Sequence, residues 1–287
     1  MSRLRTVFVI LLENKVWSEL EGSADAPYLN RELLPRASVA DGYRAPLEGR
    51  QHPSEPNYVW LEAGDNLGIH DDEHPAKNHR SEKEHLVTLL DAARISWRSY
   101  QEDIPGDRCP LEPVGMYAPK HNPMVFFDDV TDGNDPRSAR CIGHVRPLAE
   151  LETDLAKGTT PRYAFVTPNQ CNDMHTACDP DRNPIRQGDR WLAEWMPKIF
   201  ASAAYRDGGV VFLTWDEAEV APSCLLGDCP FGLLAFSPLA KGGGFTTHRT
   251  YDHSSLLRTV QEIFGVRPFL GHAKSAESLA ELFTAYP

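Results

Sequence analysis

The sequence lacks any run of about 18 consecutive apolar residues, the length that a membrane-spanning helix needs. It also has fewer basic than acidic residues: there are 29 lysine and arginine residues and 41 aspartate and glutamate residues, and the formal net charge is −12. Such a chain is a poor partner for a nucleic-acid backbone, so we expect neither a transmembrane segment nor nucleic-acid binding. A small phosphate-bearing molecule is still compatible with this charge, because a bound metal inverts the local field.

Internal repeats and low-complexity linkers are absent as well. The chain of 287 residues is long enough for one large α/β domain with a full core, and we interpret residues 1–287 as that single domain. Residues 102–145 are rich in Pro, Gly and Asp. They predict a long irregular insertion, a kind of segment that is often functional in compact domains.

None of the six cysteines is spaced as CxxC, which argues against a zinc site. Their proximity in sequence and loop-like context favours three disulfides: Cys171–Cys178, Cys224–Cys229 and Cys109–Cys141. Six cysteines allow about 15 pairings, and six reduced thiols are the alternative. Disulfides favour a secreted or periplasmic protein. Residues Met1–Leu12, however, are too short for a signal peptide and have the pattern of a strand, so the compartment is left open.

Strand and helix patterns alternate along the chain in the manner of an α/β fold. The expected strands are Thr6–Leu12, Ile95–Tyr100, Tyr163–Thr167, Val210–Trp215 and Leu233–Phe236. The expected helices are Ser54–Gly64, Glu82–Ala93, Leu148–Ala156, Trp191–Ala203 and His253–Phe264. Residues 33–40 have the pattern of a helix end and a turn. The continuous apolar runs among the strands predict a parallel sheet that is buried on both faces.

Two polar clusters follow two of these buried strands. Glu13-Asn14 comes directly after the first strand, and Asp216-Glu217 comes directly after the strand that ends at Trp215. Ligand sites in open α/β sheets lie beyond the carboxyl ends of the strands. Carboxylates gathered there would raise each other's pKa, and a divalent cation such as Mg²⁺, Ca²⁺ or Mn²⁺ would relieve the repulsion. Each pair taken alone is equally compatible with an ordinary turn.

A serine and several histidines complete the candidate chemistry. Ser54 starts a predicted helix, where free backbone N–H groups stabilise negative charge; it is either a nucleophile or simply an N-cap. His121, His175 and His253 lie in loop contexts and are candidates for phosphate donors, acids or ligands, although each is also compatible with a structural role. The acidic stretch at residues 70–74 contains two histidines, and we interpret it as a solvated loop.

Taken together, seven segments in collinear order resemble the bacterial phosphoesterase family that includes acid phosphatases and phospholipases C, within the alkaline-phosphatase-like superfamily. The segments are Leu12–Asn14, His52–Tyr58, Ile95–Pro105, Lys120–Pro123, Val166–His175, Thr214–Glu217 and Tyr251–Thr259. The resemblance implies an α/β three-layer sandwich with a central, mostly parallel sheet. It also implies that Ser54 occupies the position of the family's hydroxyl nucleophile.

The resemblance implies one divalent metal ion (Mg, Ca, Mn, Zn or Fe) held by residues that match Glu13, Asn14, Asp216 and Glu217. The glutamate at Glu217 stands where some members have aspartate, which leaves the metal and its geometry open. Residues matching His121, Asn122, His175 and His253 would contact the substrate. His175 or His253 would protonate the leaving oxygen.

The expected activity is therefore that of a phosphomonoesterase that works through a covalent phosphoserine. One alternative is a phospholipase C or phosphodiesterase with an apolar pocket rim. Its candidate rim residues, which more often pack in cores or loops, are Trp60, Trp97, Met116, Met124, Phe126 and Phe127. An inactive, metal-dependent phosphate-binding module is an alternative of another class. A sulfatase is disfavoured because no CxPxR-like sequence is present, and the oligomeric state is left open.

Overall fold

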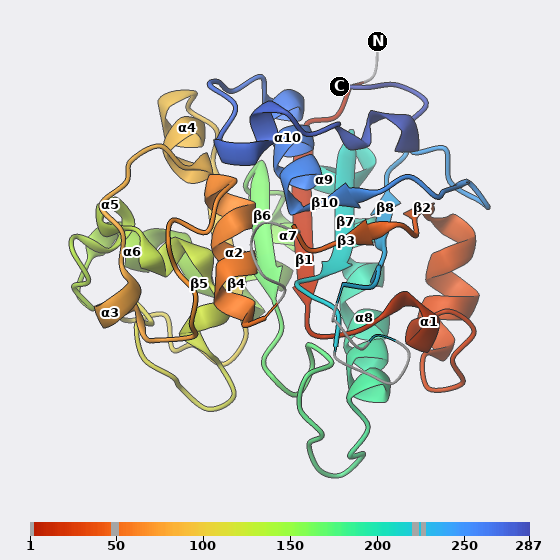
Figure 1. Ribbon diagram of the computed structural model, residues 1–287, viewed down its shortest axis with the longest axis horizontal. Helices are drawn as coiled ribbons and strands as arrows, with labels where there is room; N and C mark the ends of the chain where they lie inside the picture. The colour runs from red at the N-terminus through yellow and green to blue at the C-terminus, as the bar shows by residue number, and fades with distance from the viewer. Residues whose placement is uncertain (1–2, 47–51, 220–223, 225–227) are drawn as a thin grey trace.

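The computed structural model describes residues 3–46, 52–219, 224 and 228–287, and its centre is an eight-stranded sheet (Figure 1). The strand order is β5-β4-β6-β1-β7-β8-β2-β9. The bounds are β5 Val145–Pro147, β4 Trp97–Gln101, β6 Tyr163–Thr167, β1 Thr6–Leu12, β7 Gly209–Trp215, β8 Leu233–Phe236, β2 Ser38–Ala40 and β9 Thr246–Thr247. Strand β8 alone among these eight runs against its neighbours, and the other pairings are parallel. The predicted mostly parallel α/β sheet is confirmed.

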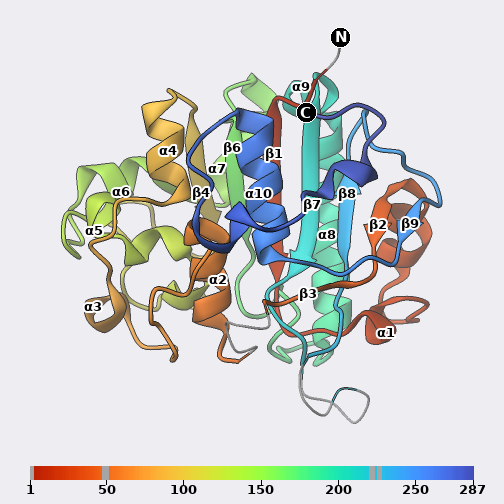
Figure 2. The same cartoon turned by 45° about the horizontal axis from the view of Figure 1, so that its top comes forward.

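The middle strands are apolar along their whole length because helices cover both faces of the sheet. Helices α2 (Ser54–Ala63), α4 (Leu86–Ala92) and α10 (His253–Phe264) lie on one face. Helices α7 (Ala149–Lys157), α8 (Pro184–Ala201) and α9 (Ala203–Arg206) lie on the other, as the turned view in Figure 2 shows. The two layers of helices and the sheet between them form the three-layer sandwich. None of the helices in the described residues is long and apolar enough to cross a membrane.

The predicted elements agree with the structure most closely in the buried strands. Strands β1, β6 and β8 and helix α10 have the predicted bounds. Helix α8 begins at Pro184 rather than at Trp191, because the Asn183 side chain caps it by accepting from the Arg186 N–H at 3.1 Å. Within residues 33–40, the predicted helix end is present up to Arg36, but residues 38–40 form strand β2, which pairs with β8 and β9, where we predicted a turn. Pairing at the edge of a sheet leaves little trace in local periodicity.

The remaining elements are short. They are α1 Trp17–Leu20, α3 Pro75–Asn78, α5 Asp128–Thr131, α6 Ala139–His144, and strands β3 Tyr43–Arg44 and β10 Tyr251–Asp252, which pair in parallel. Residues 29–36 form a π turn and a 3-10 turn, and further 3-10 turns occur at residues 119–121, 123–126, 271–274 and 279–282. The predicted insertion at residues 102–145 therefore consists of loops and short helical turns.

All three predicted disulfides are present: Cys109–Cys141, Cys171–Cys178 and Cys224–Cys229, with Cα–Cα distances of 5.3, 5.6 and 5.8 Å. The first connects the two ends of the insertion. The second closes a loop of the candidate site between β6 and α8. The division of the chain into a single domain stays a prediction.

Candidate active site

Strands β1 and β7 bring the two predicted acidic clusters to the same edge of the sheet. The strands are parallel and in register, with Leu12 opposite Trp215, and the Asp216 N–H continues the ladder by donating to the Leu12 carbonyl at 3.0 Å. Glu13 and Asp216 follow directly and are fully buried. Just beyond them, the Asn14 backbone N–H donates to Asp216 Oδ1 at 3.1 Å. Residues 202 positions apart thus share one site.

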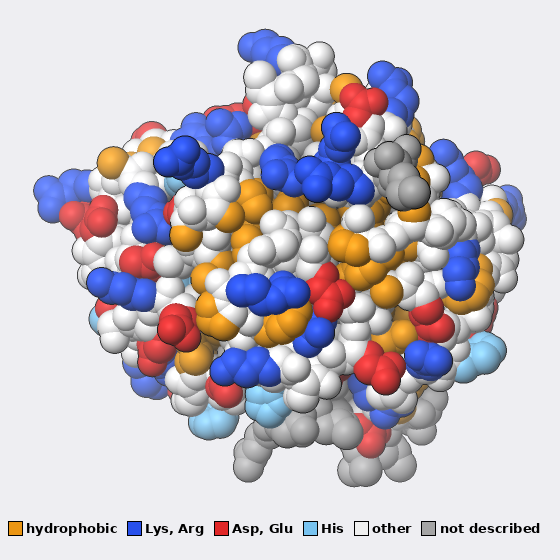
Figure 3. All heavy atoms as spheres, turned by 90° about the horizontal axis from the view of Figure 1, so that it is seen from above, with side chains coloured by type: hydrophobic (Ala, Val, Ile, Leu, Met, Phe, Trp, Pro, Cys, Tyr) orange, Lys and Arg blue, Asp and Glu red, His pale blue; other side chains and the backbone are white. Residues whose placement is uncertain are grey.

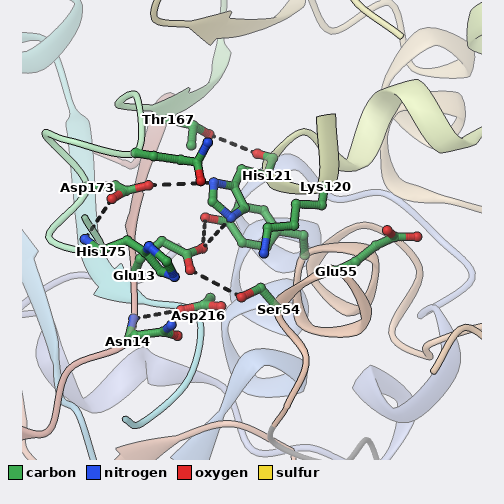
Figure 4. Close-up of polar contacts among 12 residues, drawn as sticks. Glu13, Asn14, Ser54, Glu55, Lys120, His121, Thr167, Asp173, His175 and Asp216 are labelled. Carbon is green, nitrogen blue, oxygen red and sulfur yellow. Dashed lines mark hydrogen bonds and ion pairs between the residues drawn. The ribbon is translucent and has the colours of Figure 1, made fainter. Parts of the chain in front are cut away.

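Helix α2 places Ser54 against these strand ends. The Ser54 Oγ lies 3.2 Å from Glu13 Oε2 and 3.2 Å from Glu217 Oε1 (Figure 4 shows the Glu13 contact). A hydroxyl carries only one proton, so it can donate to one of these carboxylates at a time. The contact of Ser54 Oγ with the second carboxylate is favourable only if that carboxyl group is protonated or a cation lies beside it. Ser54 is the first residue of α2, where the backbone N–H groups lack helical partners.

The site has the donors that a hard cation needs. Asn14 Oδ1 and Asp216 Oδ2 are buried and have no hydrogen-bond partner among the described residues. Burial, followed by the neighbouring carboxylates, raises the pKa of Glu13 and of Asp216 well above the ordinary values. Buried oxygens without partners, next to carboxylates that repel each other, fit an oxygen-ligated divalent ion. The residues that would hold it are Glu13, Asn14, Asp216 and Glu217.

These carboxylates gather around the Ser54 hydroxyl rather than around one another. Within the described part of the chain, three Asp, Glu, His or Cys donor atoms come within 4.8 Å of each other only at Cys224, Asp228 and Cys229. Two of those three residues are joined in a disulfide, which leaves no metal-binding thiolate there.

Three side chains that the sequence interpretation did not assign to the site hold its carboxylates. The Tyr58 hydroxyl donates to Glu13 Oε1 at 2.6 Å, and Asn57 Nδ2 donates to Glu217 Oε2 at 2.8 Å. His52 Nδ1 lies 2.6 Å from Glu217 Oε1. All three lie in the segment His52–Tyr58 that carries part of the family resemblance. The resemblance therefore included these residues, but we predicted no role for them.

His121 and Ser54 approach different oxygens of the Glu13 carboxylate. The His121 ring stacks on Tyr58, with centroids 5.0 Å apart, and its Nε2 is 3.2 Å from Glu13 Oε1. Its Nδ1 is 3.5 Å from Oδ2 of Asp173, a fourth residue that the sequence interpretation did not assign to the site. Burial, with Lys120 and His175 nearby, lowers the pKa of His121 well below its ordinary value. The lowered pKa favours the neutral imidazole, and its Nε2 has no hydrogen-bond partner among the described residues.

Asp173 is another carboxyl of the site, and it precedes the loop that carries His175. It is fully buried, and burial followed by the charge of Glu13 raises its pKa well above the ordinary value. Its Oδ1 accepts from the His175 backbone N–H at 2.8 Å, while Oδ2 has no hydrogen-bond partner in the described residues. Asp173 thus links the His121 ring to the position of His175 (Figure 4).

Lys120 supplies positive charge beside these acids and was also not predicted. Its Nζ donates to Asp72 Oδ2 at 2.6 Å, and Asp72 Oδ1 accepts from the Glu55 backbone N–H at 3.0 Å. Burial opposes the Lys120 charge, but Glu13 and Asp72 offset that effect, so the net result is a raised pKa. The stretch 70–74 is an exposed loop, as predicted, and Asp72 within it bonds to two donors next to Ser54.

His175 has the accessibility that a proton donor to substrate requires. Its side chain lies on the loop after β6, is exposed to solvent and contacts Thr176 Oγ1 through Nδ1 at 2.9 Å. Burial, then the charges of Lys120 and Lys15, lower the pKa of His175 below its ordinary value. The predicted role of His175 stays a prediction, supported by the exposure of its side chain.

His253 and Asn122 direct their polar groups into the protein. His253 is fully buried; Nδ1 is 2.8 Å from the Tyr43 hydroxyl and Nε2 is 2.6 Å from the Asp216 carbonyl oxygen. Asn122 Oδ1 accepts from Ser99 Oγ at 3.0 Å, and its Nδ2 lies 3.2 Å from the Tyr117 hydroxyl. These contacts favour positioning roles over the direct substrate contacts that we predicted, and His253 holds the backbone at Asp216.

The apolar rim of the phospholipase alternative is not formed by most of its candidates. Five of the six side chains are buried in the core, and Met116 alone among them is partly exposed. The five are Trp60, Trp97, Met124, Phe126 and Phe127. Buried side chains cannot form a lipid-facing rim, so these five residues follow the alternative interpretation, packing in the core.

Comparison with solved structures defines the class of fold. A protein of the alkaline phosphatase superfamily from Vibrio parahaemolyticus superposes with a TM-score of 0.64 at 10% identity, over 98% of this chain and 70% of that one. A phosphonate monoester hydrolase of Agrobacterium radiobacter superposes with a TM-score of 0.60 at 12% identity, over 99% and 78%. The predicted alkaline-phosphatase-like fold is confirmed.

The chain belongs to the phosphoesterase family, whose model matches residues 38–267. A phosphate-repressible acid phosphatase of Penicillium chrysogenum is 29% identical over 80% of this chain and 53% of its own length. A phosphatidylinositol-3-phosphatase of Mycobacterium tuberculosis is 27% identical over 96% of this chain and 82% of its own. The chain spans between 38% and 61% of the length of the fungal acid phosphatases that it matches. The family is thus not confined to bacteria.

Proposed function

We propose that this chain is a metal-dependent phosphoric ester hydrolase, and that it cleaves phosphomonoesters through a covalent phosphoserine at Ser54. The observation that carries the proposal is the position of the Ser54 hydroxyl, 3.2 Å from two buried carboxylates at the first turn of a helix. Membership of the phosphoesterase family and the names of the acid phosphatase relatives support the same reaction.

In the first step, the Ser54 oxygen attacks phosphorus in line with the leaving group. An O–P bond to serine forms, the ester P–O bond breaks, and the Ser54 proton passes to one of the two neighbouring carboxylates. The leaving oxygen takes a proton from His175. In the second step, water attacks phosphorus and gives one proton to His175, the bond between phosphorus and the Ser54 oxygen breaks, Ser54 takes its proton back from the carboxyl, and inorganic phosphate leaves.

The transition state needs positioning and charge stabilisation more than covalent help. Lys120 supplies a positive charge, and His121 and the Ser54 backbone N–H at the start of α2 supply hydrogen bonds to the non-bridging oxygens. When bound by Glu13, Asn14, Asp216 and Glu217, a divalent cation would lower the pKa of the Ser54 hydroxyl and neutralise substrate charge.

The proposal is tested with Ser54→Ala, assayed on a chromogenic phosphomonoester before and after metal removal. We expect turnover to fall by about three orders of magnitude or more, as when other covalent nucleophiles are deleted. Acid quenching of the wild type with a radiolabelled substrate is expected to trap a phosphoprotein that Ser54→Ala does not form. Ser202→Ala, at the N-cap of α9, is the matched control and should keep both activity and labelling.

Retained turnover in Ser54→Ala would remove this residue from the mechanism. Metal-dependent phosphate binding by the wild type, without turnover of any phosphate ester, would instead favour the inactive binding module.

We infer a monoester rather than a phosphocholine diester as substrate, because five of the proposed rim residues lie in the core. The names of the relatives, acid phosphatase and phosphatidylinositol-3-phosphatase, also refer to monoesters. The direct comparison is the rate on p-nitrophenyl phosphate against that on p-nitrophenyl phosphorylcholine. A faster reaction with the choline ester would reverse this assignment.

A further inference from the structure

The face of the molecule opposite the candidate active site carries a concentration of positive charge. Figure 3 views the side from which β1 starts, and Lys and Arg side chains gather across its middle. Strand β1 runs from this face to Glu13, so about 20 Å separates the two ends at the usual rise of a strand. The chain as a whole has a net charge of −12, so the charge of this face is opposite in sign to that of the whole chain.

Two adjoining hollows on this face are lined by four arginines, and we call them together the arginine hollow. One, of about 500 Å³, is lined by Arg3, Arg5 and Arg206. The other, of about 320 Å³, is lined by Arg5 and Arg162. Asp207 borders both and is the only carboxylate among their lining residues. Four positive charges thus face one negative charge.

These arginines are not neutralised inside the protein. Within the described part of the chain, none of Arg3, Arg5, Arg162 and Arg206 takes part in an ion pair. Burial and then the like charges of Arg3 and Arg5 lower the pKa of Arg162. Guanidinium groups held this close repel one another, and a bound anion is what relieves such repulsion.

The backbone around the hollow is held in place before any ligand arrives. The Arg5 N–H donates to the Gly208 carbonyl at 2.8 Å, and Arg162 Nε donates to the Arg5 carbonyl at 3.0 Å. Thr160 lines the second hollow, and its buried Oγ1 has no hydrogen-bond partner among the described residues. A frame of this kind lowers the ordering cost of binding.

We infer that the arginine hollow binds a soluble oxyanion of the phosphate class that carries two or more negative charges. Guanidinium forks match phosphate oxygens with paired hydrogen bonds, and the concave shape admits a small anion. A membrane surface fits less well. Docking of this face onto a bilayer would leave Ser54 on the far side of the sheet, away from the lipid.

The probe for this site is methylenebisphosphonate, which carries several negative charges and is not hydrolysed. Calorimetry on the wild-type protein is expected to show two binding events, one at the active site and one at the arginine hollow. In Arg5→Gln/Arg206→Gln, the second event should weaken by about tenfold or more, because charged hydrogen bonds are lost. Turnover of a chromogenic phosphomonoester should stay unchanged in the same variant.

The control is Arg108→Gln/Arg137→Gln, which removes the same charge from two exposed arginines that pair with Asp107 and Asp135 elsewhere. It should keep both events. Identical isotherms for the wild type and Arg5→Gln/Arg206→Gln would overturn the inference. So would a loss, in that variant only, of sedimentation with phosphatidylserine vesicles while the bisphosphonate isotherm is unchanged, because that result would assign the face to membranes. Neither outcome bears on Ser54 chemistry.

Discussion

Two histidines of this chain have nearly the same surroundings and opposite electrostatics. His85 and His121 are both buried, both stack on an aromatic ring with interplanar angles of 16° and 14°, and both face two carboxylates. His85 lies 2.9 Å from Glu62 and 2.8 Å from Asp129, and these contacts outweigh the opposing effect of burial and raise its pKa to about 9. Burial lowers the pKa of His121 instead.

The difference lies in what else surrounds each ring. Around His85 the hydrogen bonds are short and the neighbouring charges are negative, so the imidazolium is favoured. Around His121 the distances to the carboxylates are 3.2 and 3.5 Å, and Lys120 and His175 add unfavourable positive charge. One cluster is a closed ion group that stabilises the end of α2 against α4. The other keeps oxygens without partners and is suited to receive a ligand.

The largest effect is expected from His85→Gln. Removing the charge from a buried ion group leaves the buried Glu62 without a cation, while Asp129 keeps Arg140, so the free energy of unfolding should fall by about 3–5 kcal/mol. His121→Gln should change it by less than about 1 kcal/mol while turnover falls about a hundredfold, since a transition-state donor is lost. Chemical denaturation measures the free energy of unfolding of each variant, and steady-state kinetics measure its turnover. Equal losses of stability in both variants would contradict the predicted difference between the two clusters.

The pH dependence of stability sharpens the same contrast. The folded pKa of His85, about 9, is higher than its ordinary value of 6.5. Its contribution is therefore fully present below pH 6.5 and is lost as the pH rises through 9, a change of about 3 kcal/mol. Urea titrations from pH 6 to 10 should show this loss in the wild type and a flatter profile in His85→Gln. A flat wild-type profile would mean that His85 is neutral.

A smaller effect is expected at the metal ligands. Asp216→Asn keeps the shape and the Asn14 N–H bond but removes a negative charge, so divalent-ion affinity should weaken by about 10- to 100-fold. Stability of the metal-free protein should stay the same or rise, because a buried charge with a raised pKa is removed. The predicted loss of affinity is tested by titrating Asp216→Asn with metal. The matched control is Asp154→Asn, which lies far from the site. Unchanged metal content would contradict the ligand assignment.

The smallest expected effect concerns Asp72, which bonds to Lys120 and to the Glu55 N–H beside Ser54. Both donors suit a phosphoryl oxygen, so Asp72 competes with the substrate for them. Asp72→Asn should lower KM for a phosphomonoester about two- to fivefold with kcat little changed, since a screening charge is removed. Asp71→Asn is the control, because its carboxylate bonds to Asn78 and Lys77 instead. A higher KM in Asp72→Asn would make Asp72 a positioning residue for Lys120.

The strand ends were predictable because their signal is local. An apolar run such as Thr6–Leu12 can be stable only where both faces are covered, and polar residues directly after it must lie at the sheet edge. The roles of His253 and Asn122 were not predictable in this way. Their partners, Tyr43 and Ser99, are 210 and 23 positions away, and periodicity says nothing about such pairs.

By itself, the amino-acid sequence determined the buried strands, the helix that starts at Ser54 and the acidic residues after β1 and β7, because each depends on a short pattern of apolar and polar side chains. Tertiary structure alone decided that Lys120, Asp72 and Asp173 join this site, and that the pKa of His85 is raised while that of His121 is lowered. The physical reason is that desolvation and Coulomb interactions depend on distances between segments far apart in sequence, which form only when the sheet and its helices pack.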